Sequence, residues 1–175
     1  MLLPTETVAG LAARADRADA VARIFQLKGR RPDKPLAVCV ASLAAAEKLG
    51  TFSETARALA GEHWPGPLTL VVPARDAGLV PACLGSDAAG ATVALRCPIV
   101  AWREALGEHP LALTSANLSG RPSHASVAAA RADFPDVAFL SGAGDASGRP
   151  STIISVRGER VTTLRAGDIV IGVQP

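Results

Sequence analysis

The sequence predicts an α/β fold whose sheet contains both parallel and antiparallel strands. Segments in which apolar residues recur at helical spacing alternate with short apolar segments along most of the 175 residues. The last two apolar segments, at 151–156 and 160–165, flank Arg157-Gly158-Glu159, which is the pattern of a β-hairpin. Helices between strands favour parallel neighbours, whereas a hairpin is antiparallel, so a sheet of mixed direction is expected.

The helices are predicted from apolar residues that share one face and from residues that begin or end a helix. In the first helix Val21 and Ile24 lie on such a face. Asp16 or Asp19 is expected to cap its start, and Gly29 to end it. Further helices are predicted over residues 42–50 and 53–62, each beginning with a serine cap, and around 99–106 and 126–134.

The strands are predicted where short apolar segments lie between turn-forming residues. Besides the two hairpin strands, they are 36–40, 68–73, 91–96, 111–114 and 137–140. Residues 74–90 are polar, contain glycine and show little periodicity, so they are predicted to be a loop.

Composition indicates a folded domain and excludes several classes of protein. The length suits one domain over residues 1–175, and 49% hydrophobic residues can form a core. Aromatic residues are only 3%, so small and branched side chains must build that core. The net charge of +2 and the pI of about 8.6 are too mild to require a nucleic-acid partner.

Cysteines and histidines show no spacing typical of a structural site. Cys39, Cys83 and Cys97 are unpaired in pattern, so neither a disulfide framework nor a zinc site is expected. No apolar run approaches the roughly 20 residues of a membrane span. The start, MLLPTETVAG, lacks a basic region followed by a long apolar one, so no membrane contact and a cytoplasmic location are expected.

Four cations lie within KGRRPDKP, residues 28–35, where a helix is predicted to end and a strand to begin. They are Lys28, Arg30, Arg31 and Lys34. Cations that converge on one point neutralise phosphates, and arginine offers a forked donor. A solvated basic loop beside a helix C-terminus explains the same residues, so both interpretations stay open.

Small polar side chains follow predicted strands at several other places. LALTSANLSGRPS, residues 111–123, offers hydroxyls and an amide where α/β sheets often bind ligands, although an ordinary turn explains it equally. RPSTIIS at 149–155 and LRAG at 164–167 each place an arginine near a strand end. In PTETVAG, Thr7 could hold a polar group of a ligand. Glu6 and His63 are interpreted as a turn residue and a helix-end residue rather than as catalytic groups.

The well-known nucleotide and hydrolase loops do not occur. There is no G-x-x-x-x-G-K-[ST] and no G-x-S-x-G, and GAGDASG at 142–148 has the wrong spacing for a dinucleotide fingerprint. A phosphate site in this chain must therefore use side chains more than a glycine loop.

Seven motifs occur in one order along nearly the whole chain: PTET, KGR-x-x-x-KPL, WPGPLTLV, VALR-x-P, TSAN-x-SG-x-PS, STI and LRAG. In this order they resemble the YrdC-like family of threonylcarbamoyl-AMP synthases. The resemblance implies a twisted sheet with flanking helices and a concave basic cavity. It also implies a nucleotidyltransferase that converts L-threonine, bicarbonate and ATP into threonylcarbamoyl-adenylate and pyrophosphate, with Mg²⁺ accompanying ATP. A separate tRNA-modifying complex would then receive the product.

The resemblance also assigns roles to individual residues. Those implied to bind ATP are Arg30, Lys34, Thr92, Ser115, Ser123 and Arg165. Those implied to bind threonine are Thr7, Arg96, Ser151 and Cys39. Those implied to form the catalytic centre are Lys28, Arg30, Ser115 and Asn117. No residue is assigned as a dedicated metal ligand.

Three departures from the family pattern leave alternatives open. Ala9 stands where the family usually has tyrosine, and Cys39 where it usually has histidine. Family members also usually have a helix and a strand before Pro4, so an upstream start or a short paralogue is expected. The alternatives are a diverged paralogue that binds ATP with another small substrate, and an RNA-binding module without this activity.

Overall fold

The structure, a computed structural model, describes residues 1–76, 78–142 and 146–172. Its strands are β1 (Leu2–Leu3), β2 (Gly10–Arg14), β3 (Ala37–Cys39), β4 (Leu68–Pro73), β5 (Leu84–Asp87), β6 (Gly90–Arg96), β7 (Leu111–Ser115), β8 (Thr152–Arg157) and β9 (Arg160–Arg165). Its α-helices are α1 (Ala18–Lys28), α2 (Leu43–Leu49), α3 (Glu54–His63) and α4 (Val127–Ala130), and its 3₁₀ helices are η1 (Pro81–Cys83) and η2 (Ala101–Leu106).

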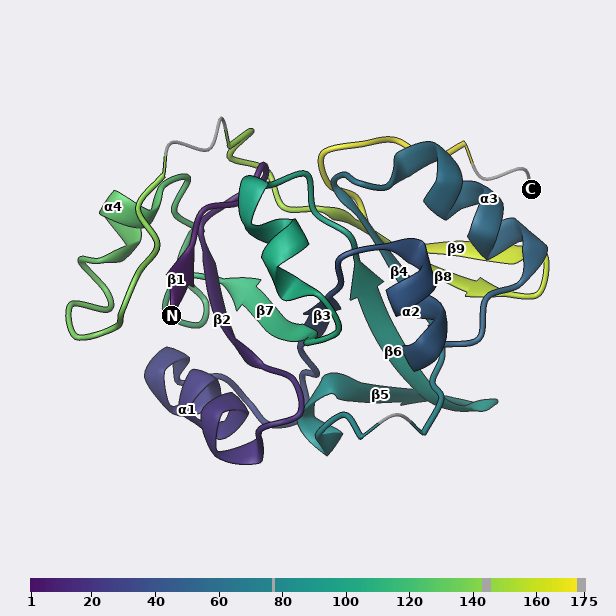
Figure 1. Ribbon diagram of the computed structural model, residues 1–175, viewed down its shortest axis with the longest axis horizontal. Helices are drawn as coiled ribbons and strands as arrows, with labels where there is room; N and C mark the ends of the chain where they lie inside the picture. Colours follow the sequence, from purple (N-terminus) through teal and green to yellow (C-terminus); the bar gives the residue numbers. More distant parts are fainter. Residues whose placement is uncertain (77, 143–145, 173–175) are drawn as a thin grey trace.

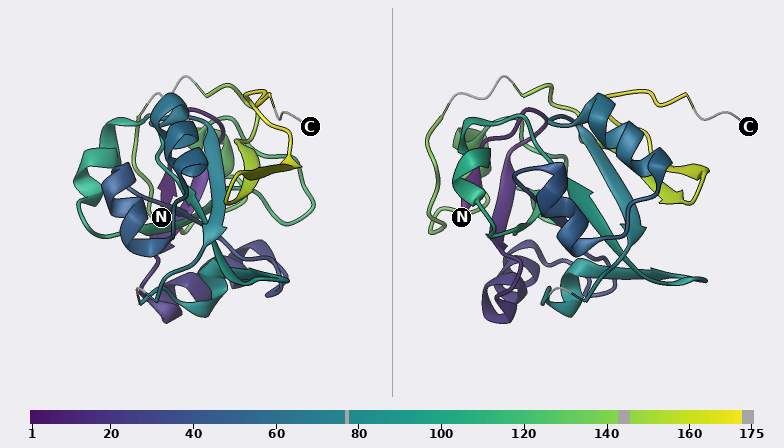
Figure 2. Two further views of the ribbon diagram at one scale, coloured as in Figure 1. Left: turned by 90° about the vertical axis from the view of Figure 1, so that its right-hand side faces the viewer. Right: turned by 45° about the vertical axis from the view of Figure 1, so that its right-hand side comes forward.

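These strands form one mixed sheet, as Figure 1 shows. The order is β1-β2-β7-β3-β6-β4-β8-β9, and β5 pairs with β6 beside this path. β3 and β6 are parallel, as are β4 and β8, whereas the other pairs are antiparallel. Strands at the two ends of the sheet point in clearly different directions because the sheet twists (Figure 2). The predicted α/β fold with a mixed, twisted sheet is confirmed.

The two faces of the sheet are packed differently. Alternate residues of a strand point to opposite faces, so Val38 and Ala112 enter the larger core, which contains the buried apolar residues of α1, α2, α3 and α4. Cys39 and Leu113 lie on the other face, in a small cluster with Trp102 of η2. The second face is therefore only partly covered by apolar packing, which leaves room for a polar site.

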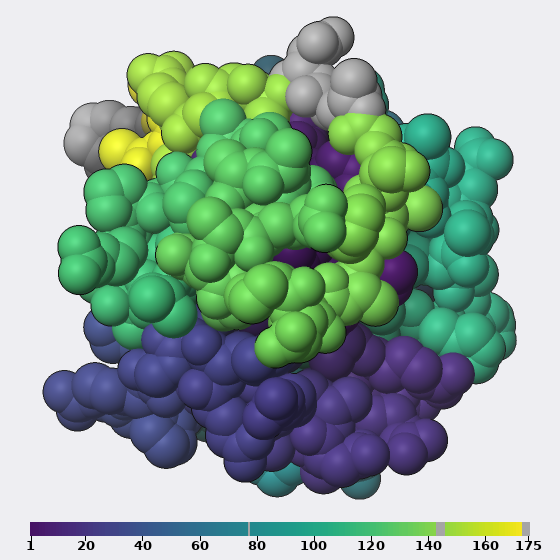
Figure 3. All heavy atoms as spheres, turned by 90° about the vertical axis from the view of Figure 1, so that its left-hand side faces the viewer, coloured from purple at the N-terminus to yellow at the C-terminus, as the bar shows by residue number. Residues whose placement is uncertain are grey.

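Residues 117–140 cover the outer side of β1. The amide of Leu2 donates to the carbonyl of Ala138 at 2.7 Å, and the amide of Leu140 donates to the carbonyl of Leu2 at 2.9 Å. Figure 3 shows this segment over the N-terminal strand, with α1 beneath it. The edge of the sheet is thus paired rather than left open to another chain. Among the described residues, no helix has both the length and the apolar character needed to cross a bilayer.

Most predicted elements are confirmed. The first three helices, the hairpin and the strands at β3, β4, β6 and β7 lie where the sequence indicates. Ser42 and Ser53 cap α2 and α3 by accepting from the amides of Ala45 and Ala56, each at 3.2 Å. The predicted aspartate cap of α1 is wrong, because its N-cap is Arg17, which makes no side-chain capping bond.

Other expectations are corrected by the structure. The segment 74–90 is not only a loop, since it contains η1 and β5, which pairs with β6. The helix expected at 99–106 is the 3₁₀ helix η2, and that expected at 126–134 is α-helical only over Val127–Ala130. Residues 137–140 form a single bridge to β1 instead of a strand. Of the GAGDASG stretch, residues 143–145 lie outside the described ranges.

Candidate functional site

A cavity of about 240 Å³ opens on the less covered face of the sheet. The register of four neighbouring strands builds its floor, because Cys39 lies beside Arg96, Arg96 beside Thr69, and Thr69 beside Ile153. Side chains in one such row point to the same face. The sheet therefore places a thiol, a guanidinium and a hydroxyl side by side.

The cavity is lined mainly by cationic and hydroxyl side chains. Three arginines line it: Arg30, Arg96 and Arg165. Seven hydroxyl residues line it: Thr5, Thr7, Thr69, Thr114, Ser115, Ser123 and Ser151. No aspartate, glutamate, histidine or lysine of the described chain is among the lining residues. Such a lining favours an anionic ligand with several oxygen atoms.

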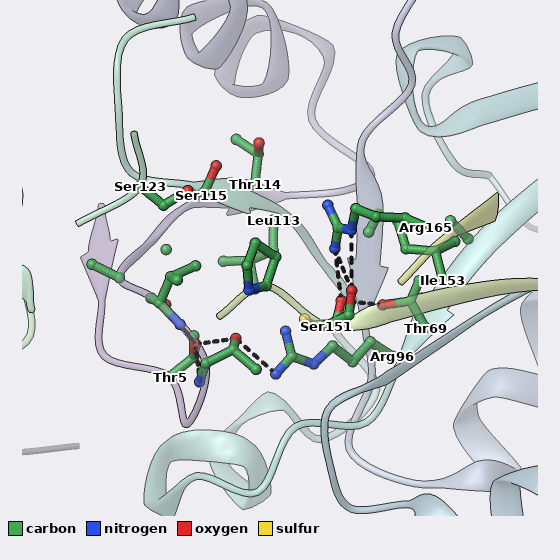
Figure 4. A pocket seen from close by; sticks show the side chains of 18 of the residues that line it. Thr5, Thr69, Arg96, Leu113, Thr114, Ser115, Ser123, Ser151, Ile153 and Arg165 are labelled. Carbon is green, nitrogen blue, oxygen red and sulfur yellow. Dashed lines mark hydrogen bonds between the residues drawn. The ribbon is translucent and has the colours of Figure 1, made fainter. Parts of the chain in front are cut away.

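The hairpin end supplies one wall of the cavity. Ser151 directly precedes β8 and Arg165 ends β9, so the hairpin brings them together. Arg165 donates from Nη2 to the Ser151 carbonyl at 2.7 Å and to its Oγ at 3.1 Å, and Ser151 Oγ lies 2.9 Å from Thr69 Oγ1. Partial burial, and then the charge of Arg96, lower the pKa of Arg165. Figure 4 shows Arg165 and Ser151 across the cavity from Ser115 and Ser123.

Arg96 lies on the floor and is held by three neighbouring groups. Its Nη2 donates to Thr7 Oγ1 at 3.0 Å and lies 2.9 Å from Oε1 of Glu6. Its Nε donates to the carbonyl of Gly66 at 3.4 Å. Thr7 is placed by a turn in which Thr5 Oγ1 accepts from the amides of Thr7 and Val8 at 3.2 and 3.3 Å.

Arg30 enters the cavity from the end of α1. Gly29 ends that helix with a left-handed φ of 59°, which glycine adopts without strain. Arg30 then donates to the carbonyls of Lys34 and Pro35 at 3.0 and 3.1 Å, and burial lowers the pKa of its guanidinium. Its neighbour Arg31 instead pairs with an exposed carboxylate outside the cavity.

Lys28 and Asn117 support the cavity from behind instead of lining it. Lys28 is 3% exposed, and its Nζ donates to the carbonyls of Ser115 and Asn117, the latter at 2.6 Å. Burial is the main cause that lowers the pKa of Lys28 to about 8, and the charge of Arg30 lowers it further. The side-chain amide of Asn117 donates to the carbonyls of Leu118 and Arg121 at 2.9 and 2.7 Å. Both residues therefore hold the turn between Ser115 and Ser123.

The residues predicted for the site fall into two groups. Those that line the cavity are Thr7, Arg30, Cys39, Arg96, Ser115, Ser123, Ser151 and Arg165. Those outside the lining are Lys28, Lys34, Thr92 and Asn117. The segments 28–34, 115–123 and 151–165, distant in the sequence, thus share one hollow. The role of each residue stays a prediction.

Sequence reasoning missed Thr5, Thr69, Thr114 and the partner of Arg96, Glu6. Thr69 could have been found, because in LTLVVP it alternates with Leu68 and Leu70, which belong to the core. Nothing in the sequence indicates which side chain pairs with Arg96, since Glu6 is 90 residues distant in the chain and would pass for a turn residue.

The two single-residue departures from the family pattern, Ala9 and Cys39, both lie at the cavity. Ala9 and Cys39 line it and are fully buried. Burial raises the pKa of the Cys39 thiol to about 12, so this residue presents a neutral thiol. All three cysteines are unpaired and buried.

The lining does not fit a resident Mg²⁺ ion. Mg²⁺ in proteins is usually bound by one or two carboxylates together with phosphate oxygens and waters. The lining residues of the described chain offer hydroxyl and carbonyl oxygens but no carboxylate. A magnesium ion that accompanies ATP would therefore be part of the substrate.

Several curated proteins similar to this chain are named as threonylcarbamoyl-AMP synthases. The threonylcarbamoyl-AMP synthase of Pyrococcus abyssi is 40% identical over 174 residues, covering 95% of this chain and 49% of the relative. That of Bacillus subtilis is 38% identical over 172 residues, with the same coverage. A putative threonylcarbamoyl-AMP synthase of Mycobacterium leprae is 35% identical over 190 residues, covering 100% of this chain and 83% of the relative. The chain spans about half the length of the first two relatives.

Solved structures and a family model agree with these relatives. The crystal structure of P. abyssi Sua5 complexed with L-threonine has a TM-score of 0.80 at 37% identity, over 95% of this chain and 49% of that one. The crystal structure of E. coli YciO has a TM-score of 0.81 at 19% identity, covering 95% of this chain and 82% of that chain. This likeness supports the fold alone. The sequence model of Sua5_yciO_yrdC, described as "Telomere recombination", matches residues 1–167. With its fold and its sequence in agreement over nearly its whole length, the chain belongs to the Sua5/YciO/YrdC family.

Proposed function

We propose that this chain catalyses the formation of threonylcarbamoyl-adenylate and pyrophosphate from L-threonine, bicarbonate and ATP. The observation that carries the proposal is the single cavity in which three guanidinium groups and seven hydroxyl side chains meet. The substrates would bring carboxylate and phosphate oxygens, which are the partners that such groups bind best. The relatives' names and the threonine complex of P. abyssi Sua5 support the same choice.

The reaction suits a cavity without a strong base. The threonine amine and bicarbonate would form a carbamate with loss of water. A carbamate oxygen would then attack the α-phosphorus of ATP, forming the new O–P bond as the bond to pyrophosphate breaks. Because that oxygen is already an anion, the attack needs no general base, and the protein acts by positioning and charge neutralisation.

The cavity divides into two sides in this proposal. Arg96, Thr7 and Ser151 would hold the amino acid, in keeping with the family resemblance. Arg30, together with Ser115 and Ser123 of the turn after β7, would hold phosphate oxygens. Thr92 lies outside the lining, two residues along β6 from the lining residue Ala94, so a nucleoside that extends beyond the cavity would reach it.

A second candidate function is the activation of another small amine. Ala9 and Cys39 lie in the cavity itself, and neither matches the family pattern. A smaller side chain at Ala9 leaves more room beside the amino-acid side. Substrate screening by thermal shift separates the candidates, because threonine should stabilise the protein only if it is the substrate.

A basic RNA-binding surface is less well supported. Of the four cations in residues 28–35, Lys28 is buried, Arg30 is bonded to carbonyls, and Arg31 is paired with Asp33. Lys34 is the one exposed cation of the four for which the described chain shows no ion pair. One exposed cation without such a contact would give little of the salt dependence typical of phosphate-backbone binding.

The test is pyrophosphate release from ATP across a panel of amino acids, with and without bicarbonate. Release that requires both threonine and bicarbonate is expected. Ser115→Ala should reduce it strongly, whereas Ser119→Ala, an exposed serine in the same turn, should not. Absence of release from a well-folded protein would refute the proposal. Delivery of the product to a tRNA-modifying complex would be tested by adding that complex and a tRNA.

A further inference from the structure

Glu6 pairs with Arg96 of the cavity floor, yet it does not itself line the cavity. The flanking residues Thr5 and Thr7 face the cavity, while Glu6 reaches behind it to the loop that follows β6. Its side chain is 14% exposed, and that of its partner Arg96 is 8% exposed. A buried ion pair at this place needs an explanation, because burying charge costs several kcal/mol per ion, which attraction between the charges often fails to recover.

The contacts of Glu6 fix one nitrogen of Arg96. Oε1 of Glu6 lies 2.9 Å from Arg96 Nη2 and accepts from the amide of Ile99 at 3.0 Å. Because Nη2 also donates to Thr7, and Nε to a carbonyl, two of the three guanidinium nitrogens are occupied. Within the described residues Nη1 has no protein acceptor. Figure 4 shows the Arg96 side chain extending along the cavity floor toward the turn that carries Thr5.

Glu6 also sets the charge of the floor. Arg96 and Arg165 are close enough for the charge of Arg96 to lower the pKa of Arg165. In the described chain, Glu6 is the one carboxylate that pairs with either of them. The guanidiniums of Arg96 and Arg165 and the carboxylate of Glu6 together carry a net charge of +1. This charge complements a substrate with a single carboxylate.

A purely structural role explains these contacts less well. Oε2 of Glu6 is buried and has no hydrogen-bond partner in the described chain. An unpartnered buried carboxylate oxygen is unfavourable, because it has lost its hydration without gaining a hydrogen-bond donor. The turn itself is already held by Thr5, whose hydroxyl bonds to the main chain of Thr7 and Val8. The carboxylate is therefore not needed to shape the turn.

We propose that Glu6 is a positioning residue for the amino-acid substrate: it holds Arg96 so that Nη1 is presented to the substrate carboxylate. This inference rests on the proposed function. Glu6 touches neither the substrate nor the reacting atoms, and it acts through Arg96. Without it, Arg96 would lose its charged partner and turn away from the similarly charged Arg165.

The test uses Glu6→Gln, which preserves shape and the acceptor for Ile99 but removes the charge. We expect the KM for threonine to rise about tenfold, while the KM for ATP stays within about twofold. Glu108→Gln is the matched control, because Glu108 pairs with a lysine at the exposed surface, and it should change neither value. A second readout is the Arg96 Nε–Hε signal in NMR, assigned by its loss in Arg96→Lys, which should broaden or shift in Glu6→Gln.

Failure of the positioning role can be distinguished from failure of the proposed function. A threonine KM that stays unchanged, falls, or rises together with the KM for ATP would overturn the positioning role, as would an unchanged Arg96 signal. A fall is the result expected if Glu6 only weakened the attraction of Arg96 for anions. If the wild-type protein releases no pyrophosphate with threonine, the proposed function fails, and the Arg96 signal still decides whether Glu6 fixes the guanidinium.

Discussion

Replacing Lys28 by methionine should remove a rise in stability that the wild-type protein shows at alkaline pH. The ordinary pKa of lysine is 10.5, and burial lowers that of Lys28 to about 8. Between these values the unfolded chain binds a proton at this residue that the folded chain does not, so the free energy of unfolding rises with pH. At about 1.4 kcal/mol per pH unit, the full rise is on the order of 3 kcal/mol.

The substitution also removes two hydrogen bonds that hold the turn after β7. Methionine keeps the length of the buried stem but leaves the carbonyls of Ser115 and Asn117 without their donor. Each lost bond to a charged group costs about 1.5–3 kcal/mol, and removal of the buried charge offsets part of this near neutral pH. The difference in stability between wild type and Lys28→Met should therefore be modest at pH 7 and larger at pH 10.

Urea unfolding of both proteins at pH 7, 8, 9 and 10 measures this difference. Taking the difference cancels other groups, including Cys39, whose raised pKa makes stability fall above its ordinary value of 9.0. Lys48→Met serves as the control, because Lys48 is exposed and paired with Glu108, and its difference should stay flat. Parallel curves for wild type and Lys28→Met would refute the reasoning. A difference that narrows with pH would show that the two carbonyls favour the charged form more than burial opposes it.

The remaining predictions concern binding, turnover and packing. Arg30→Ala should weaken ATP binding by about 1.5–3 kcal/mol in calorimetry. Arg31→Ala, which removes an exposed ion pair, should leave the affinity unchanged. Equal ATP affinities in the wild type and both variants would contradict the assigned site. Ser115→Ala should lower kcat without lowering Tm, and a large loss of Tm would mean that the hydroxyl is structural. Gly167→Ala should destabilise the hairpin end, because a Cβ there would lie 2.3 Å from the carbonyl oxygen of Pro150; an unchanged midpoint of urea unfolding would show that this contact relaxes.

The elements predicted correctly from the sequence are those whose signals are local. Ser42 and Ser53 identify helix starts because the cap and its amide partner lie three residues apart. β2 was missed because GLAAR contains no β-branched residue, and β5 because LGSD reads as a turn. β2 is a strand because β7, about 100 residues along the chain, pairs with it, whereas β5 pairs with the next strand β6 across a tight turn between Asp87 and Gly90.

The candidate site was predicted to a similar extent and for similar reasons. Motif order predicts that Arg30, Ser115 and Arg165 share one site, and all three line the cavity. Motif order does not tell which side of a turn a residue occupies. Lys28 and Asn117 are expected at the centre of the cavity, but they lie behind its lining. Whether these side chains point into the cavity or away from it depends on how the end of α1 packs against the turn after β7. No local sequence pattern encodes that packing.

The row formed by Cys39, Arg96, Thr69 and Ile153 ties the chemistry of this protein to the fidelity of its folding. If β6 slipped by one residue against β4, Arg96 would be driven into the apolar interior and Leu95 would face the ligand. A molecule with the wrong register would thus be both unstable and inactive. Cellular proteases that remove unstable proteins would therefore also remove the inactive ones. New ligand specificities should arise by substitutions along this row of side chains. Insertions within the four strands should abolish the site, because they shift the register.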